Sequence, residues 1–241
     1  MTAAAAEGAR RDPHPCPPPP AAEGGPPVVV VAVDGPAAAG KGTLARRLAE
    51  ALGLPHLDTG LLYRAVGRRV LDRGADPRDA AAAEREARAL DPADLARPDL
   101  RGPDADMAAS AVAAIPAVRA ALLEFQRGFG RRRGAVLDGR DIGTVVFPDA
   151  AVKLFLTASV EERARRRWLE LRDRGVAADP ARVEAELRAR DAQDAGRPVA
   201  PLRPAPDALL LDTTALDADA ALDAALGLVR ARLSARPARA G

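Results

Sequence analysis

The feature that most constrains this chain is an apolar run that leads directly into a glycine-rich turn. Residues 28–33 are Val-Val-Val-Val-Ala-Val, which predicts a buried strand of a parallel sheet. Gly35 and Gly40 mark the turn. A predicted helix follows, with its apolar face at Leu44, Leu48 and Leu52. In such a unit, backbone N–H groups and the helix N-terminus converge on one anion, so the sequence predicts a phosphate-binding loop.

The spacing within this loop fits the Walker A pattern with one departure. Gly35-x-x-x-x-Gly40-Lys41 is complete, but Gly42 stands where Ser or Thr usually follows the lysine, and the hydroxyl comes one place later, at Thr43. We therefore do not expect this hydroxyl to bind Mg²⁺ directly. The chain has two lysines against thirty-four arginines, so routine surface charge explains Lys41 poorly. The predicted phosphate-binding residues are Gly35, Pro36, Ala37, Ala38, Ala39, Gly40, Lys41, Gly42 and Thr43.

Length and composition limit the possible classes of protein. A chain of 241 residues suffices for one α/β domain with a small inserted lobe. The net charge of +2 creates no strong field, so we expect neither nucleic acid nor a membrane as a partner. Cys16 is the only cysteine, which rules out an intrachain disulfide or a cysteine-based zinc site and suits the cytoplasm. We also expect no membrane span and no signal peptide.

The chain divides into a tail and one predicted domain. Residues 1–27 hold eight of the twenty-two prolines, and we predict that they are disordered. The domain spans residues 28–241. Within it, residues 74–120 form a predicted peripheral lobe, whose part up to residue 104 shows no strand pattern, and residues 175–200 form a predicted lid.

Five short apolar runs predict five strands. After residues 28–33, these runs are 54–57, 134–138, 151–156 and 208–211. Apolar residues at spacings of three and four predict the intervening helices. On the helix that Pro116 opens, this spacing places Val118, Leu122, Phe125 and Phe129 on the inner face. On the helix over 159–174, it leaves four arginines exposed to varying degrees, one or two of them able to reach a phosphate: Arg163, Arg165, Arg166 and Arg167.

Charged residues follow the strand at 134–138. Asp138 lies at its carboxyl end and is followed by Gly139-Arg140-Asp141. In a sheet that also carries a phosphate loop, a carboxylate at this end is the expected ligand of a Mg²⁺-bound water. Arg140 and Asp141 are then expected to point into the same crevice. The alternative is an Asp-Gly turn with a solvated arginine.

The helix that ends near Gly196 carries the second strong signal. Val183 and Leu187 set an inward stripe that continues as Arg190, Asp194 and Arg197. Charged groups on a covered face need partners. We predict nucleotide phosphate as the partner, with Asp194 orienting the arginines, in a lid that excludes water when it closes. The alternative is a frayed helix end with charges facing solvent.

Together these motifs resemble the bacterial cytidylate kinases, which are P-loop nucleoside monophosphate kinases. The resemblance runs from about Val28 to Leu233 and rests on the phosphate loop, on Asp58-Thr59-Gly60 with Arg64, on Asp138-Gly-Arg-Asp141 and on Arg190-x-x-x-Asp194-x-x-Arg197. It implies a three-layer α/β fold of the P-loop NTPase type, with a five-stranded parallel sheet, a monophosphate-binding insert and an arginine-bearing lid. Many members have a longer insert with a small antiparallel sheet. The sequence of residues 74–104 predicts no strand for such a sheet.

The same resemblance implies phosphoryl transfer from ATP, with Mg²⁺, to CMP and dCMP, and poorly to UMP; we expect a monomer. Its implied cytosine-binding residues are Ser110, Arg119 and Asp141. Those implied to hold the CMP phosphate or the transferred group are Thr59, Arg64, Arg190 and Arg197, with Asp194 facing the sugar hydroxyls. The implied catalytic residues are Lys41, Arg140, Arg190 and Arg197, and Asp138 would hold Mg²⁺ through water. On spacing alone, Arg64 is equally well a surface arginine.

The expected reaction is in-line attack by a CMP phosphate oxygen on the γ-phosphorus of Mg-ATP. The acceptor phosphate is ionised near neutral pH, so no general base is needed. Two other functions remain open. One is a P-loop kinase of another small acceptor, such as a shikimate- or gluconate-type metabolite. The other is a nucleotide switch, which the absence of an Asn-Lys-x-Asp base-recognition motif disfavours.

Overall fold

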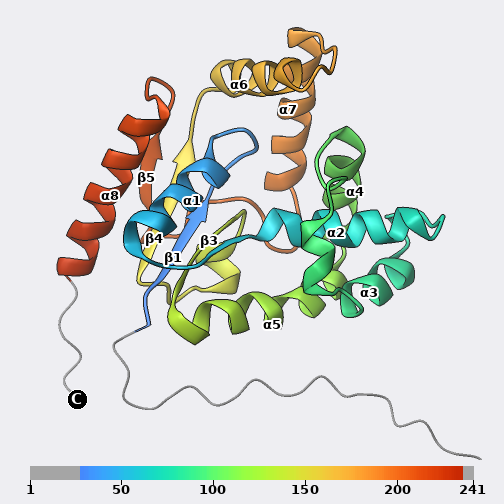
Figure 1. Cartoon of the computed structure of the whole chain (residues 1–241), viewed down its shortest axis with the longest axis horizontal. Helices are drawn as coiled ribbons and strands as arrows, with labels where there is room; N and C mark the ends of the chain where they lie inside the picture. The colour runs from blue at the N-terminus through green and yellow to red at the C-terminus, as the bar shows by residue number, and fades with distance from the viewer. Residues whose placement is uncertain (1–27, 236–241) are drawn as a thin grey trace, which may run out of the picture.

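A five-stranded parallel sheet forms the centre of the molecule (Figure 1). The strands are β1 (Val30–Asp34), β2 (His56–Asp58), β3 (Ala135–Gly139), β4 (Val152–Thr157) and β5 (Leu209–Asp212). Their order in the sheet is β2-β3-β1-β4-β5, and each neighbouring pair is parallel. The computed structural model describes residues 28–235, so the predicted disorder of the first 27 residues lies outside the described residues. The predicted α/β class and its five-stranded parallel sheet are confirmed.

Helices cover both faces of this sheet. They are α1 (Lys41–Leu52), α2 (Thr59–Asp72), α3 (Ala80–Arg88), α4 (Pro103–Ala113), α5 (Pro116–Arg133), α6 (Val160–Asp173), α7 (Pro180–Ala195) and α8 (Ala218–Ser234), with short helical turns η1 (Pro92–Ala96) and η2 (Ile142–Val146). Alternate residues of β1 face opposite layers. Val31 and Val33 pack with α1 and α8, and Val30 and Ala32 pack with α2 and α5. The result is three layers with an apolar core on each side of the sheet.

Local sequence sets the ends of the helices that flank the phosphate loop. Gly53 ends α1 in the left-handed conformation, with φ at 65°. Asp58 caps α2, because its side chain accepts a hydrogen bond from the Leu61 N–H at 3.3 Å. The apolar residues of α2 recur every four positions and lie in the core, since Leu62, Val66 and Val70 have no exposed surface. These caps fix where each helix starts relative to the carboxyl ends of the strands.

The inserted lobe is built from helices. Over residues 74–104, all of which the structure describes, α3 and η1 are present and no strand forms, as predicted. The lobe is joined to α2 by a close crossing of α2 and α4. A β-carbon on Gly67 would come within 2.8 Å of the Ala108 side chain, so only glycine allows this approach. The crossing brings Arg64, on α2, opposite Asp106, on α4.

Two sequence-based expectations about side-chain burial are wrong. Phe125 is 37% exposed, whereas Gln126 beside it is 2% exposed. The glutamine is satisfied in the core because its Nε2 donates to the Leu122 carbonyl at 3.1 Å. Arg163 is 6% exposed, because its guanidinium turns back along α6 to the Ala158 carbonyl at 2.9 Å. Apolar spacing predicts which face of a helix is covered, but not which polar side chains find partners there.

Within the described part of the chain, no single helix is long and apolar enough to cross a bilayer. One bent pair, residues 104–113 with 116–133, meets the length and composition requirements only when its two parts are taken together across a 96° bend. Both parts contribute to the core of the sheet, through Val112, Val118 and Leu122.

Candidate active site

The phosphate loop connects β1 to α1 through backbone conformations that few residues adopt. Gly35 has φ at 149°, and a β-carbon there would collide with the Leu156 carbonyl oxygen on β4. Gly40, at φ 85°, is the residue before the first turn of α1. Ala38 also has a positive φ of 58°, which is a strained conformation for a residue with a side chain. The loop is therefore held in one shape by its surroundings.

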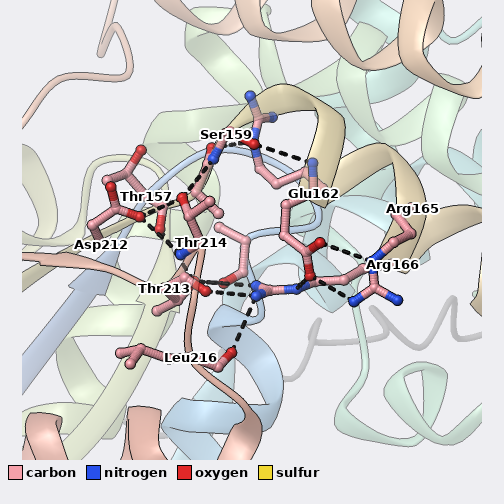
Figure 2. Close-up of polar contacts among 12 residues, drawn as sticks. Thr157, Ser159, Glu162, Arg165, Arg166, Asp212, Thr213, Thr214 and Leu216 are labelled. Atoms are coloured by element: carbon pink, nitrogen blue, oxygen red, sulfur yellow. Dashed lines mark hydrogen bonds and ion pairs between the residues drawn. The ribbon is translucent and has the colours of Figure 1, made fainter.

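Two elements far along the chain hold the carbonyl groups of this loop. Arg163, on α6, donates from Nη1 to the Ala37 carbonyl at 3.3 Å, and Thr213, after β5, donates from Oγ1 to the Ala39 carbonyl at 3.4 Å. Figure 2 shows that Arg166 joins these two elements, because its Nη2 donates to the Thr213 carbonyl at 2.6 Å and to the Leu216 carbonyl at 3.3 Å. The sequence predicts that one or two arginines of α6 reach a phosphate. In the structure, Arg163 donates to the backbone of the loop, and Arg166 donates to the backbone of the segment after β5.

Lys41 lies within the loop. It is 6% exposed, and its Nζ donates to the Pro36 carbonyl at 2.6 Å. Burial lowers the pKa of Lys41, as do the charges of Arg140 and Arg190, while Asp138 and Asp194 act in the opposite direction. The charges that act on this ammonium thus come from β3 and its following turn and from α7. Thr43, by contrast, is exposed on the outer side of α1.

Acidic side chains line the carboxyl ends of the three neighbouring strands β2, β3 and β1. Asp58 and Asp138 are paired residues of β2 and β3, and Asp34 ends β1. His56 Nε2 lies 2.7 Å from Asp138 Oδ1, and Thr59 Oγ1 donates to the Asp138 carbonyl at 2.7 Å. Burial raises the pKa of Asp58, and the adjacent charge of Asp138 raises it further. Two neighbouring carboxylates of this kind favour a cation.

Asp34 has a different task from the other two carboxylates. Its two oxygens accept from the backbone N–H groups of Ile142 and Gly143, at 2.8 and 2.7 Å. They therefore tie the end of β1 to the start of η2. Burial raises the pKa of Asp34 to about 6, against the lowering effect of these two hydrogen bonds.

The residues around Asp138 fit a magnesium ion that nucleotide phosphates bring with them. Asp138 Oδ2 lies on the side of the loop, 4.0 Å from where a Gly42 β-carbon would stand, so the missing side chain leaves the carboxylate open toward the first turn of α1. Within residues 28–235, no group of three or more His, Cys, Asp or Glu side chains forms a metal cage. A carboxylate that is open toward the phosphate loop suits Mg²⁺, which proteins usually hold through one or two carboxylates together with waters and substrate phosphates.

A second set of contacts joins the inserted lobe to the turn after β3. Arg119, on α5, forms an ion pair with Asp141, and both side chains are at least 90% buried. Arg119 also stacks over the Tyr63 ring, 5.7 Å from its centroid, and donates to the Ala113 carbonyl at 3.4 Å. Ser110 lies on α4, one turn before that carbonyl, and is half-buried. The Arg119 guanidinium, a hydrogen-bond donor, and the Asp141 carboxylate, an acceptor, therefore lie side by side and are both held in place.

The charged stripe at the end of α7 faces inward, and a frayed end with solvent-facing charges is ruled out. Asp194 is 1% exposed, accepts from Arg140 Nε at 2.8 Å and forms an ion pair with Arg197. Burial alone raises the pKa of Asp194, but Arg140 and Arg197 outweigh it and hold the pKa below its usual value. Among the described residues, the Nε atoms of Arg190 and Arg197 are buried without a hydrogen-bond partner. Buried donors of this kind indicate room for an acceptor.

A third cluster of charge surrounds Asp106, on α4. Its Oδ1 accepts from Arg64 Nε at 3.0 Å, and its Oδ2 accepts from Arg167 Nη2 at 2.8 Å. Arg190 Nη1 lies 3.9 Å from Oδ1. The arginines come from α2, α6 and α7, so this one carboxylate links α4 to three other helices.

The structure brings the predicted site residues into one charged region. Asp138 acts on both Lys41 and Arg64, Arg140 acts on Lys41 and Asp194, and Arg197 acts on Asp141. Arg140, Arg190 and Asp194 therefore lie near enough to the phosphate loop for their charges to act on Lys41. The sequence selects Arg167 only as one of four arginines on the helix over 159–174. It gives no signal for three other side chains that support this region: His56, Asp106 and Thr213. None follows a motif or stands on a periodic face, so no sequence signal could have selected them.

The fold and the candidate site together define the class to which the protein belongs. The features of a P-loop kinase are a parallel sheet in the order β2-β3-β1-β4-β5, a Walker A loop after its central strand, and arginines on α7 and in the turn after β3 whose charges act on the loop lysine. A solved structure supports the fold alone: an uncharacterized protein from Eubacterium ventriosum is 15% identical, with a TM-score of 0.50, over 85% of this chain and 99% of that one.

Sequence comparison then gives the family. The cytidylate kinase family model matches residues 31–231. The cytidylate kinase of Granulibacter bethesdensis is 67% identical over 199 residues, which are 83% of this chain and 95% of that protein. The cytidylate kinase of Acidiphilium cryptum is 64% identical over 198 residues, which are 82% of this chain and 93% of that protein. The chain belongs to the cytidylate kinase family and is a phosphotransferase, as the resemblance in the sequence predicts.

Proposed function

We propose that this enzyme transfers the γ-phosphoryl group of Mg-ATP to CMP and dCMP, forming CDP and dCDP. The observation that carries the proposal is that a Walker A lysine lies buried in the loop after β1, while the buried Nε atoms of Arg190 and Arg197 have no hydrogen-bond partner among the described residues. Phosphoryl transfer needs positioning and charge compensation more than covalent help, and this region supplies both. The names of the closely similar family members support CMP as the acceptor.

On the donor side, the backbone of residues 35–43 surrounds the ATP phosphates. Lys41 leaves the Pro36 carbonyl and pairs with the β- and γ-phosphate oxygens, so the loop exchanges an internal hydrogen bond for a charge-assisted one. Asp138 would hold Mg²⁺ through a water, and the ion would supply charge neutralisation at the phosphates. The hydrogen bonds from Arg163 and Thr213 to the Ala37 and Ala39 carbonyl groups keep these carbonyls turned away from the bound anion.

On the acceptor side, cytosine and phosphate contact different residues. Arg64, Arg190 and Arg197 hold the phosphate, with Thr59 beside them and Asp194 facing the sugar. Arg119 and Asp141, with Ser110, bind the base.

The paired charges of Arg119 and Asp141 explain a preference for cytosine. Cytosine presents an N4 amino donor next to acceptor atoms, so the Asp141 carboxylate accepts from N4 while Arg119 donates to the acceptors. Uracil carries an oxygen where cytosine carries the amino group, and that oxygen would face the carboxylate. This arrangement would favour CMP and dCMP over UMP, because the wrong base would leave a buried charge unpaired.

In the reaction, the acceptor phosphate attacks in line while Lys41, Arg140, Arg190 and Arg197 balance the charge on the transferred group. Residues 74–120 act as the monophosphate-binding lobe, and residues 175–200 as the lid that excludes water. We propose that the enzyme acts as a monomer. An ATP-dependent nucleotide kinase of this kind works in the cytoplasm.

Steady-state assays that couple ADP formation to NADH oxidation test this function. CMP and dCMP should support turnover, UMP should do so poorly, and AMP, shikimate and gluconate should give only the background ATPase rate. A preference for shikimate or gluconate would replace the proposed function with that of another small-acceptor kinase.

A further inference from the structure

The most unusual charge arrangement outside the donor loop is the one around Asp106. Two arginines contact its separate oxygens, Arg64 at 3.0 Å and Arg167 at 2.8 Å, and Arg190 lies within 3.9 Å. Convergence of three guanidinium groups from three helices on one anion is the geometry with which proteins bind phosphate. Here the anion is part of the chain.

The environment keeps this carboxylate charged. Burial alone raises the pKa of Asp106, but Arg64, Arg190 and Arg167 together outweigh it, so the pKa lies below its usual value. Two of the arginines have a second carboxylate, since Asp58 lies 3.8 Å from Arg64 and Glu170 lies 2.9 Å from Arg167. The match at Arg190 is nevertheless incomplete, because among the described residues its buried Nε has no hydrogen-bond partner. A phosphate monoester, with up to two charges and three free oxygens, would satisfy these arginines better.

We propose that Asp106 is a specificity-determining residue that occupies the place of the acceptor phosphate and is exchanged for it when the nucleotide binds. This inference rests on the proposed function, because Arg64 and Arg190 are there assigned to that phosphate. Exchange breaks the contacts of Asp106 with Arg64 and Arg190 and forms arginine–phosphate pairs in their place. No covalent bond changes.

The need to displace Asp106 lowers the affinity of the acceptor site for small anions. Inorganic phosphate gains the arginine contacts but must displace a carboxylate that already makes them. CMP gains the same contacts together with those of its base at Arg119 and Asp141. Asp106 therefore makes binding depend on the whole nucleotide and keeps the abundant inorganic phosphate of a cell out of the acceptor site.

The experiment compares the wild-type chain with Asp106→Asn. Asp104→Asn is the matched control, because Asp104 lies in the same first turn of α4 and is exposed. Saturating Mg-ADP is present throughout, so that the donor loop is filled, and the binding of inorganic phosphate is measured by calorimetry. We expect Asp106→Asn to bind inorganic phosphate about tenfold or more tightly than wild type, since the competing charge is gone. Asp104→Asn should match wild type.

Two further measurements localise the effect. In Asp106→Asn, KM for CMP should fall and inorganic phosphate should become a competitive inhibitor against CMP, while KM for ATP is unchanged. Adding Arg190→Ala to Asp106→Asn should abolish the gain in phosphate binding. Should Asp106→Asn be less stable because its arginines repel one another, its unfolding temperature should rise with added phosphate more than that of wild type.

Unchanged or weaker phosphate binding by Asp106→Asn would overturn the inference and make Asp106 a positioning residue for the arginines. So would a phosphate-dependent rise in unfolding temperature no larger than that of wild type. These results are distinct from a failure of the proposed function. If the wild-type enzyme forms no CDP, the proposed function fails, whereas the phosphate measurements still report on Asp106.

Discussion

The two halves of the candidate active site are built in different ways. The donor loop spans residues 35–43, and its proposed ligand-binding groups are mainly backbone N–H groups. Glycine and close packing against Leu156 set the conformation of this backbone. The acceptor region draws side chains from α2, α4, α5, α7 and the turn after β3, and these are held by ion pairs such as those of Asp194 and Asp106. One half is local and built from main chain, while the other is assembled from distant side chains.

This difference has a mechanical consequence. A backbone loop held by β4, α6 and the segment after β5 cannot change shape without disturbing the sheet. Side chains that pair with one another can exchange partners at small cost, because each guanidinium finds an oxygen before and after the change. We infer that the donor loop is the fixed reference and that the acceptor region and lid rearrange around it.

The largest expected effect is on turnover, from the acceptor half. Arg190→Ala should lower kcat for CMP phosphorylation about 10³-fold, the loss typical of a charge-compensating arginine in phosphoryl transfer. Arg188→Ala is the control, because Arg188 is on the same helix but is 57% exposed and pairs only with surface glutamates. Its turnover should stay near that of wild type. Equal losses in both variants would mean that α7 matters for stability rather than for the transferred group.

The next effect is on stability, from the donor half. Gly35→Ala should lower the free energy of unfolding by about 4 kcal/mol, because a methyl group would overlap the Leu156 carbonyl oxygen and the backbone conformation is strained for alanine. Gly53→Ala is matched to it, since Gly53 also has a positive φ but has open space around it. That substitution should cost only about 1 kcal/mol. Urea unfolding of both variants measures the difference, and similar values would show that the loop yields to its neighbours.

The smallest effect is a pH dependence at the junction of the two halves. Burial raises the pKa of Asp34 from 3.8 to about 6. Between these two values the folded state holds a proton that the unfolded state has lost, so the stability contributed at this residue falls as pH rises. The free energy of unfolding of wild type minus that of Asp34→Asn should therefore drop by about 2 kcal/mol from pH 4.5 to pH 7. A difference in the free energy of unfolding that stays constant from pH 4.5 to pH 7 would contradict the raised pKa of Asp34.

The contrast between a local main-chain loop and side chains from distant segments also explains how much could be predicted from the sequence. The donor loop follows from neighbouring residues: a β-branched strand, two glycines, a lysine and a helix. The parallel sheet and the apolar face of α2 follow from hydrophobic patterning in the same way. The charges at the end of α7 could be recognised because Arg190 and Asp194 continue a stripe that Val183 and Leu187 begin.

The remaining features depend on contacts between distant segments. His56 and Asp138 are 82 residues apart in sequence, and Arg167 and Asp106 are 61 apart, so no local pattern relates them. Arg163 was expected to be exposed because arginine is usually solvated, yet the Ala37 carbonyl and Asp191 give it partners that only the fold provides. Partner choice among thirty-four arginines is a tertiary property.

Equilibrium binding of each nucleotide to one variant from each half tests the central claim most directly. Calorimetry should show that Lys41→Met binds ATP much more weakly and CMP about as well as wild type, whereas Arg64→Ala binds CMP more weakly and ATP as well as wild type. This crossed pattern is what a fixed donor loop facing a separate acceptor region predicts. Loss of both nucleotides in both variants, or of neither in either, would contradict it.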